Sequence, residues 1–270
     1  YITIDKDAVR RSGMMMASDT IPDRMVISLA GKRALYKNDL MMLEMLAECN
    51  WKRPLYVATT VGSENYMNLG DNFVQEGLAY RITPFTTRNP GVRNFDTEKT
   101  YNNVMNRFKF GGLETPGLYI DETVMRMCLT HHLFAQLALE LIAEGKNDKA
   151  LKVLRKAEKV LPEYNIPLSF MSGAPDIAKA YALLGKKADA KRVLDKVWNR
   201  EKEYADYYIQ QTGSRFDMCQ DSMMRQMYIL KNISDITSLF DVKSAKKRMD
   251  AVDKYYSIYQ SKGGAIYEGQ

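Results

Sequence analysis

The chain has 270 residues but only two histidines, His131 and His132, and this scarcity limits its catalytic chemistry. A Ser/His/Asp or Cys/His triad would have to use this pair, and no GxSxG nucleophile elbow accompanies it. Adjacent residues on a helix point about 100° apart, so the two rings cannot share a tetrahedral metal site. Ala135 and Gln136 occupy the positions of an i, i+4 carboxylate partner. We therefore expect no catalytic residue, no metal and no cofactor, with one histidine in the core and one in solvent.

The turn at residues 59–65, Thr-Thr-Val-Gly-Ser-Glu-Asn, could hold an anion, because it reads as a strand, a glycine turn and a helix start with free N–H groups. It contains neither GxGxxG nor GxxxxGKS/T, and Glu64 places negative charge where a phosphate would bind. A simple N-cap is the favoured role of Ser63. The alternative is a small-molecule or enzymatic site at the strand carboxyl ends, with Ser63, Asn65 and Tyr80 as its residues.

The cysteines and one acidic pair do not suggest a reactive site. Cys49, Cys128 and Cys219 are widely spaced, odd in number and without a CxxC motif, which argues against a disulfide framework and a zinc site. We expect them to be buried as small hydrophobic side chains. Asp71 and Glu76 lie five residues apart on a predicted helix, so their carboxylates diverge and are poorly placed for acid/base work.

A group of aromatic residues is a further candidate for ligand binding. It comprises Tyr204, Tyr207, Tyr208 and Arg215. On the concave side of a helical stack, their flat apolar faces and hydrogen-bonding groups would suit a sugar or a peptide. Ordinary packing between helical repeats is the alternative, and it is the commoner use of such residues.

Composition indicates a folded chain with no membrane span of its own. A content of 46% hydrophobic and 10% aromatic residues exceeds that of disordered chains. The formal charge is +6, but basic residues alternate with acidic ones, as at residues 146–149, so we expect no nucleic-acid partner. The longest apolar stretch, 124–143, contains Arg126 and Glu140, whereas a span needs about 20 apolar residues. Because the chain starts at Tyr1, we expect a piece of a longer protein.

The first part of the chain predicts alternating strands and helices. Helix 38–49 has Asn38 as its predicted N-cap and an inward face made of Leu40, Leu43, Leu46 and Ala47. Before and after it come strand 25–29, strand 54–60, a helix from residue 62 to residue 77 and strand 78–84. This β-α-β-α-β order predicts parallel strands joined by crossovers. A helix near 97–108 then leads out of an α/β subdomain that we place at residues 1–115.

The second part, residues 116–270, has the hydrophobic period of paired helices and matches the tetratricopeptide spacing. Small residues let two antiparallel helices approach closely, and a glycine turns the chain between them. The first copy consists of Phe134, Leu137, Ala138, Leu141, Gly145, Ala150, Leu154, Ala157 and Pro162. The second, offset by 40 residues, consists of Ile177, Ala178, Tyr181, Gly185, Ala190, Leu194 and Val197. A third, degenerate pair is expected at 223–240 and 244–259, with Ala245, Met249 and Val252 inward. The predicted fold class is therefore α+β: a small parallel subdomain followed by a tetratricopeptide-like all-α array.

Several segments in combination resemble one protein family. They are RALYKNDL at 33–40, WKRPLYVA at 51–58, GLAYR at 77–81, FKFGG at 108–112 and PGLYID at 116–121. The chain resembles the C-terminal soluble region of a bacterial family of multi-spanning membrane proteins, formerly a domain of unknown function, related to GT-C type protein O-mannosyltransferases. The resemblance covers the whole chain, although each motif is chemically uninformative by itself.

The resemblance implies a membrane-embedded glycosyltransferase part before Tyr1, which would use a lipid-linked sugar donor. Its catalytic acidic residue would lie in an early extracytoplasmic loop, and no residue of this chain matches that motif. The resemblance also implies a location at the periplasmic face of the inner membrane. We therefore expect a non-catalytic domain that positions acceptor protein or contacts the membrane domain of the same parent, and that meets lipid-linked sugar only through that domain. A scaffold that dimerises through an exposed helix face is the remaining alternative.

Overall fold

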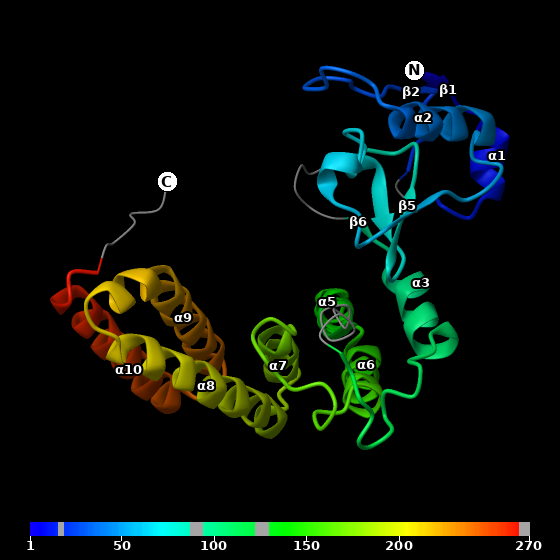
Figure 1. The fold of residues 1–270 in the computed structure, drawn as a ribbon. Coiled ribbons are helices and arrows are strands. Elements are labelled where there is room, and N and C mark those ends of the chain that lie inside the picture. Colours follow the sequence, from blue (N-terminus) through cyan, green and yellow to red (C-terminus); the bar gives the residue numbers. More distant parts are fainter. Residues whose placement is uncertain (16–18, 87–93, 122–129, 265–270) are drawn as a thin grey trace. The chain divides into compact units, whose positions relative to one another are not determined.

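The computed structural model divides into two compact units, Tyr1–Phe108 and Lys109–Gln270, which we describe separately. Figure 1 shows the elements of each unit. The structure describes residues 1–15, 19–86, 94–121 and 130–264. The domain boundary expected after residue 115 stays a prediction. The division after Phe108 shows which residues contact one another, and it does not show which segment folds alone.

The strands of the first unit form two small sheets that are mainly antiparallel. Strand β1 (Ile2–Thr3) pairs with β2 (Arg24–Met25), and a four-stranded sheet has the order β3-β5-β4-β6. In that sheet β5 (Ala79–Ile82) runs antiparallel to both β3 (Tyr56–Ala58) and β4 (Phe73–Gln75). Only the short pair of β4 with β6 (Asn94–Phe95) is parallel among the described strands. The predicted parallel β-α-β-α-β subdomain is therefore wrong.

The error comes from the segment before β5, which was expected to be a helix ending at Gly77. It contains two 3-10 turns, η1 (Ser63–Asn65) and η2 (Gly70–Asn72), and then β4. Met67 and Asn68 have positive φ angles of 52° and 58°, which interrupts any helix. Gly77 has a φ of 112° and turns β4 directly into β5, and so short a connection can join only antiparallel strands.

Helix α2 (Lys37–Cys49) confirms the predicted helix to within one residue, but its cap and its buried face differ. Its N-cap is Tyr36 rather than Asn38, and the Tyr36 N–H donates to Asp39 Oδ2 at 3.0 Å. Leu46 is buried and Leu43 half-buried, whereas Leu40 and Ala47 are exposed. The buried core that Leu46 joins includes Ala8 and Val9 of α1 (Lys6–Arg11), and also Trp51 and Met67, which lie in separate segments of the chain.

The remaining elements of this unit are shorter than predicted. Strands β2, β3 and β5 each cover only part of the runs expected at 25–29, 54–60 and 78–84. The helix expected near residues 97–108 is confirmed as α3 (Thr97–Asn102), continued by a π-helical turn, η3 (Asn103–Arg107). Val104 is fully buried there, as expected, while Met105 and Phe108 are half-buried.

The second unit is an array of packed helices. The helices are α5 (Thr130–Ala143), α6 (Asn147–Val160), α7 (Ala174–Leu183), α8 (Lys187–Gln210), α9 (Ser214–Ser238) and α10 (Val242–Ser261). Helix α5 packs against α6 and α7, and α8, α9 and α10 each pack against the helix before. Figure 1 shows this succession from green to red.

The small residues predicted to lie between helices are buried. Ala138, Ala150, Ala178 and Ala190 have no exposed surface, and Ala157 has 1%. The larger residues of the first two predicted copies are buried with them: Phe134, Leu137, Leu141, Leu154, Ile177, Tyr181, Leu194 and Val197. Because an alanine leaves only a methyl group between two backbones, these positions let the helices approach closely.

The turns of the first two hairpins have the same geometry. Gly145 and Gly185 have φ angles of 75° and 71°, where a residue with a side chain would be strained. The following N–H groups bond back to the preceding helix, from Lys146 to Leu141 at 2.8 Å and from Lys186 to Tyr181 at 2.9 Å. These are the six-to-one hydrogen bonds of a glycine-terminated helix.

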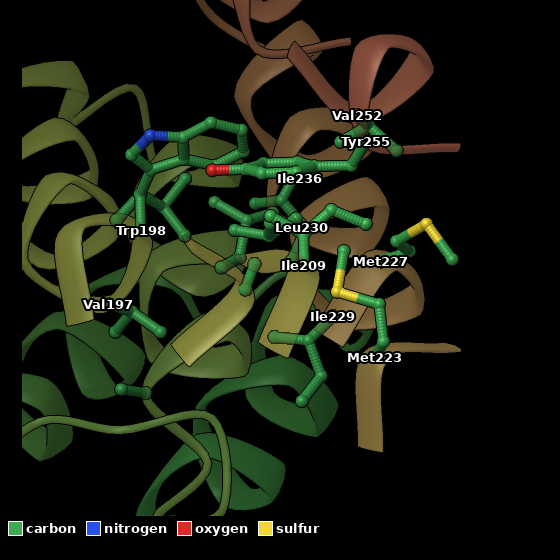
Figure 2. Close-up of a cluster of buried hydrophobic side chains, with 14 of the residues drawn as sticks. Val197, Trp198, Ile209, Met223, Met227, Ile229, Leu230, Ile236, Val252 and Tyr255 are labelled. Atoms are coloured by element: carbon green, nitrogen blue, oxygen red, sulfur yellow. The ribbon is translucent and has the colours of Figure 1, made fainter. Parts of the chain in front are cut away.

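The last three helices share one hydrophobic core, which Figure 2 shows. Helix α8 contributes Trp198 and Ile209, and α10 contributes Val252 and Tyr255. The residues from α9 are Phe216, Met223, Met227, Ile229, Leu230, Ile233 and Ile236. At 24 and 25 residues, α8 and α9 are much longer than α5, α6 and α7, so the array is not a regular repeat.

Two alanines of α8 test the importance of close packing. We expect Ala190→Leu to lower the free energy of unfolding by about 1–3 kcal/mol, because the added methylenes have no space at a fully buried site. The matched variant Ala188→Leu, two residues away on the exposed face, should change it by less than about 0.5 kcal/mol. Urea unfolding monitored by circular dichroism measures both, and equal effects would contradict the close-packing argument.

Candidate functional site

A cleft of about 420 Å³ lies within the helical array. Its residues come from α5, α6, α7, α8 and the loop between α6 and α7. They are His131, Arg155, Ala157, Glu158, Leu161, Pro162, Glu163, Tyr164, Leu168, Ile177, Asp189, Arg192 and Val193. The volume falls in the range of small-ligand sites, and a mainly apolar wall with a few polar groups is their usual lining. We call it the α6–α8 cleft.

Four alternating charges cross one side of the α6–α8 cleft. Arg155 donates to both carboxylate oxygens of Asp189, at 3.0 and 2.7 Å, and to Glu158 at 3.0 Å. Arg192 pairs with Glu158 and lies 3.9 Å from Asp189. The hydrogen bond to Asp189 raises the pKa of Arg155, and the same contact lowers the pKa of Asp189. Two guanidinium groups and two carboxylates thus meet here, and their formal charges sum to zero.

His131 is the one buried histidine in the cleft. It is 2% exposed, and its Nδ1 atom has no hydrogen-bond partner among the described residues. Burial lowers its pKa from 6.5 to about 4, against the opposing effect of a hydrogen bond with the Leu161 backbone. The expected core histidine is thus confirmed. Its neighbour His132 is half-buried rather than in solvent, with Nε2 2.8 Å from the Met171 carbonyl oxygen.

This lowered pKa predicts acid sensitivity. Between pH 6.5 and about 4, the unfolded chain binds a proton at residue 131 that the folded chain does not. This difference in proton binding has no effect on the free energy of unfolding above pH 6.5. As the pH falls to about 4 and below, it lowers the free energy of unfolding by roughly 3 kcal/mol. The difference in unfolding free energy between the wild type and His131→Phe should therefore change across this window. A constant difference would show that the site does not exclude the charged imidazole.

The predicted tyrosine group is partly assembled. Tyr204, Tyr207 and Tyr208 line an open hollow of about 540 Å³ on α8 together with Arg200 and Glu203. The rings of Tyr207 and Tyr208 meet edge to face, with centroids 5.4 Å apart. Tyr204 and Tyr207 are exposed, whereas Tyr208 packs against the core, so ordinary packing accounts for only part of the group. Arg215 lies on α9 and does not line the hollow.

The residues of the alternative site in the first unit lie in different surroundings. Ser63 and Asn65 are exposed on η1, where the N-cap is Gly62 rather than Ser63, and Asn65 Nδ2 donates to Glu64 Oε1 at 3.1 Å. Tyr80 is a core residue whose ring stacks on Phe73 at 5.8 Å. Because the main strand pairs are antiparallel, their carboxyl ends do not share one edge, and the premise of this site fails.

A buried charge network in the first unit escaped the sequence analysis. Glu76, only 8% exposed, accepts hydrogen bonds from Tyr56 at 2.7 Å and Lys99 at 2.8 Å. Arg81 lies 3.6 Å from Glu76 and donates to the Ser12 carbonyl at 2.9 Å. Burial and then the bond to Glu76 raise the pKa of Tyr56 to about 12. A hairpin predicted at Gly77 could have indicated this network, because a turn at that residue places Glu76 near Arg81.

Replacing one carboxylate tests this network. Glu76→Gln should cost about 3 kcal/mol or more of unfolding free energy, because Arg81 would stay buried without a countercharge. Asp71→Asn is the control, since Asp71 is exposed, and it should stay within about 0.5 kcal/mol of the wild type. If chemical unfolding shows equal stability for Glu76→Gln and the wild type, Arg81 does not depend on this carboxylate.

Metal and cysteine chemistry have little support in the described part of the chain. Among these residues, His, Cys, Asp and Glu form no group of three or more that could hold a metal ion. Cys49 and Cys219 are free and half-buried rather than buried, and Cys128 lies outside the described residues. None of the described helices is long and apolar enough to cross a membrane.

Comparison with known proteins gives one match. Residues 1–101 match the model of the family TMEM260-associated domain 2. TMEM260 is an O-mannosyltransferase-like membrane protein family, so the expected resemblance is supported for the first unit. The match ends before the helical array. No curated protein and no solved structure matches the chain.

Proposed function

We propose that this chain is a non-catalytic, extracytoplasmic domain of an O-mannosyltransferase-like membrane protein, and that its helical array holds acceptor polypeptide for the membrane part. The observation that carries the proposal is the α6–α8 cleft, which lies among the tightly packed helices α5 to α8. A site of this kind retains a ligand through shape and hydrogen bonds. Its charged groups are paired with one another rather than directed at a reacting atom.

The family match supports the parent assignment. A domain similar to TMEM260-associated domain 2 precedes the helices in the same chain, so the array would be carried by a membrane protein of that kind. In this proposal the domain lies on the periplasmic side and contacts the membrane domain of its own parent. Lipid-linked sugar reaches the acceptor only through that membrane domain, and nucleic acid has no role.

The packing of the array supports a tetratricopeptide-like arrangement for the first two hairpins. Their buried alanines occupy equivalent positions, and both turns end in the same glycine-centred hydrogen bonds. Helix-hairpin arrays of this type present exposed clefts along their length, and binding of extended polypeptide is a function that such clefts suit. The open tyrosine hollow on α8 provides a further aromatic surface for the same purpose.

Binding of an unfolded polypeptide tests the proposal directly. We expect the chain to bind lysozyme that has been reduced and S-carboxamidomethylated, and not to bind native lysozyme, because only the unfolded form offers extended segments. Fluorescence anisotropy measures the binding, and sedimentation velocity shows whether the chain itself self-associates.

Two results would contradict the proposal. One is the absence of binding to the unfolded probe by a chain that sedimentation and circular dichroism show to be folded. The other is hydrolase or transferase turnover that is lost when a residue of this chain is replaced. A stable dimer that binds no polypeptide would favour the scaffold alternative.

A further inference from the structure

We infer that the connection between β2 and α2, together with the first turn of α2, docks on the surface of a phospholipid bilayer that contains anionic lipid. We call this region the β2–α2 surface. The inference goes beyond the proposed holding of polypeptide and does not depend on the α6–α8 cleft. The exposed members of the surface are the apolar residues Val26, Leu29, Leu35, Tyr36, Leu40 and Met41 and the basic residues Arg33 and Lys37.

The apolar side chains of the β2–α2 surface are open to solvent. Val26 is 71% exposed and Tyr36 is 69% exposed, and residues 28–31 and 33–38 are all exposed. Figure 1 shows the connection as a blue loop that extends away from β2 and α2. Leu40 lies four residues after Tyr36, so it continues the apolar side of this surface along the helix. Exposed apolar side chains that gather in this way mark an interaction surface, whereas isolated ones need no explanation.

Hydrogen bonds at the base of the connection hold it in this exposed position. Asn68 Nδ2 donates to two carbonyl oxygens of the connection, those of Ser28 and Ala30, at 2.9 and 3.1 Å. The buried carboxylate of Asp39 accepts a hydrogen bond from Lys32 Nζ at 2.6 Å. Because these contacts fix the backbone on both sides of the tip, the connection keeps its apolar side chains outside the core of the unit.

The charge of the connection is positive along its whole length. Residues 24–38 contain four basic residues and no acidic one. Lys32 is neutralised by Asp39, whereas Arg33 and Lys37 form no ion pair with another described residue. The next exposed carboxylate along α2 is Glu44, one turn beyond Leu40. Two free cations therefore lie among the apolar side chains of the β2–α2 surface.

This combination of groups favours a lipid surface as the occupant. The headgroup region of a bilayer takes up exposed apolar side chains, and its anionic lipids attract Lys and Arg side chains held close to it. A second copy of the chain would instead place its own cations against Arg33 and Lys37, because a two-fold contact brings the same surface together. When docked, Leu29, Leu35 and Tyr36 enter the headgroup layer, and the two cations lie against lipid phosphates.

Vesicle flotation with the whole chain tests the role of the cations. We expect the wild type to bind vesicles of equimolar phosphatidylglycerol and phosphatidylcholine, and to bind pure phosphatidylcholine vesicles about tenfold more weakly or less. Replacing Arg33→Gln together with Lys37→Gln should weaken binding to the anionic vesicles about 25-fold, at about fivefold for each cation.

A second pair of cations in the same unit is the matched control. Lys52→Gln together with Arg53→Gln removes the same charge from two exposed residues beyond the other end of α2. These residues lie roughly 20 Å along the helix from Lys37, which exceeds the Debye length at physiological salt. The control variant should therefore lose much less affinity for the anionic vesicles than the variant of Arg33 and Lys37.

A pair of tryptophan variants tests whether the apolar side chains enter the bilayer. Tyr36→Trp places the probe on the β2–α2 surface, and Tyr228→Trp places it on α9 at a similar exposure of 66%. We expect phosphatidylcholine with brominated acyl chains, mixed with phosphatidylglycerol, to quench the tryptophan at residue 36 and not the one at residue 228. Circular dichroism confirms that each variant is folded, since every replaced residue is exposed.

Four results would overturn the inference. They are no binding of the folded wild type to anionic vesicles, equal binding to both kinds of vesicle, equal loss of affinity in the two double variants, and equal quenching of the two tryptophans. Binding to poly-L-glutamate without binding to vesicles would assign the cations to an acidic protein partner, and self-association lost in Tyr36→Ser would assign the surface to a second copy. A chain that binds unfolded lysozyme but no vesicle would refute this inference alone, and one that binds vesicles but no lysozyme would refute only the proposed function.

Discussion

Close contact between helices at alanine positions is the constraint on which the second unit depends. Ala138, Ala150, Ala178 and Ala190 have no exposed surface, so the helices on either side approach to the distance that a single methyl group permits. This spacing brings α6 near α8, and Arg155 can then bond both oxygens of Asp189 across the two helices. The cleft and its ring of charges are consequences of the same packing.

The first unit is stabilised differently. The strands described in it have four residues or fewer, and a large part of its described interior is polar. Glu76, which follows β4, bonds to Lys99 of α3 and to Tyr56 of β3, and Arg81 extends this network to the Ser12 carbonyl. Since a buried charge is tolerated only with partners, these residues hold the elements in one arrangement.

The two units contribute different evidence about function. The first has the family match and no assembled site among its predicted residues, because Tyr80 lies in the core while Ser63 and Asn65 are exposed. The second lies beyond the match and contains the cleft with His131. The parent protein is therefore inferred from one part of the chain and the binding chemistry from the other.

Local sequence patterns determined the helical array. The period of apolar residues, the alanines and the turn glycines act within one hairpin, so α5 to α8 could be predicted from residue type and spacing. The same pattern predicted one buried histidine in the pair, but not that it is His131. Only the tertiary structure decided the direction of the strands, because Met67 and Asn68 adopt left-handed backbone angles that no helical period reveals. It also decided the partners of Glu76 and the α6–α8 cleft, since residues as distant as Arg155 and Asp189 meet only when helices far apart in sequence pack together.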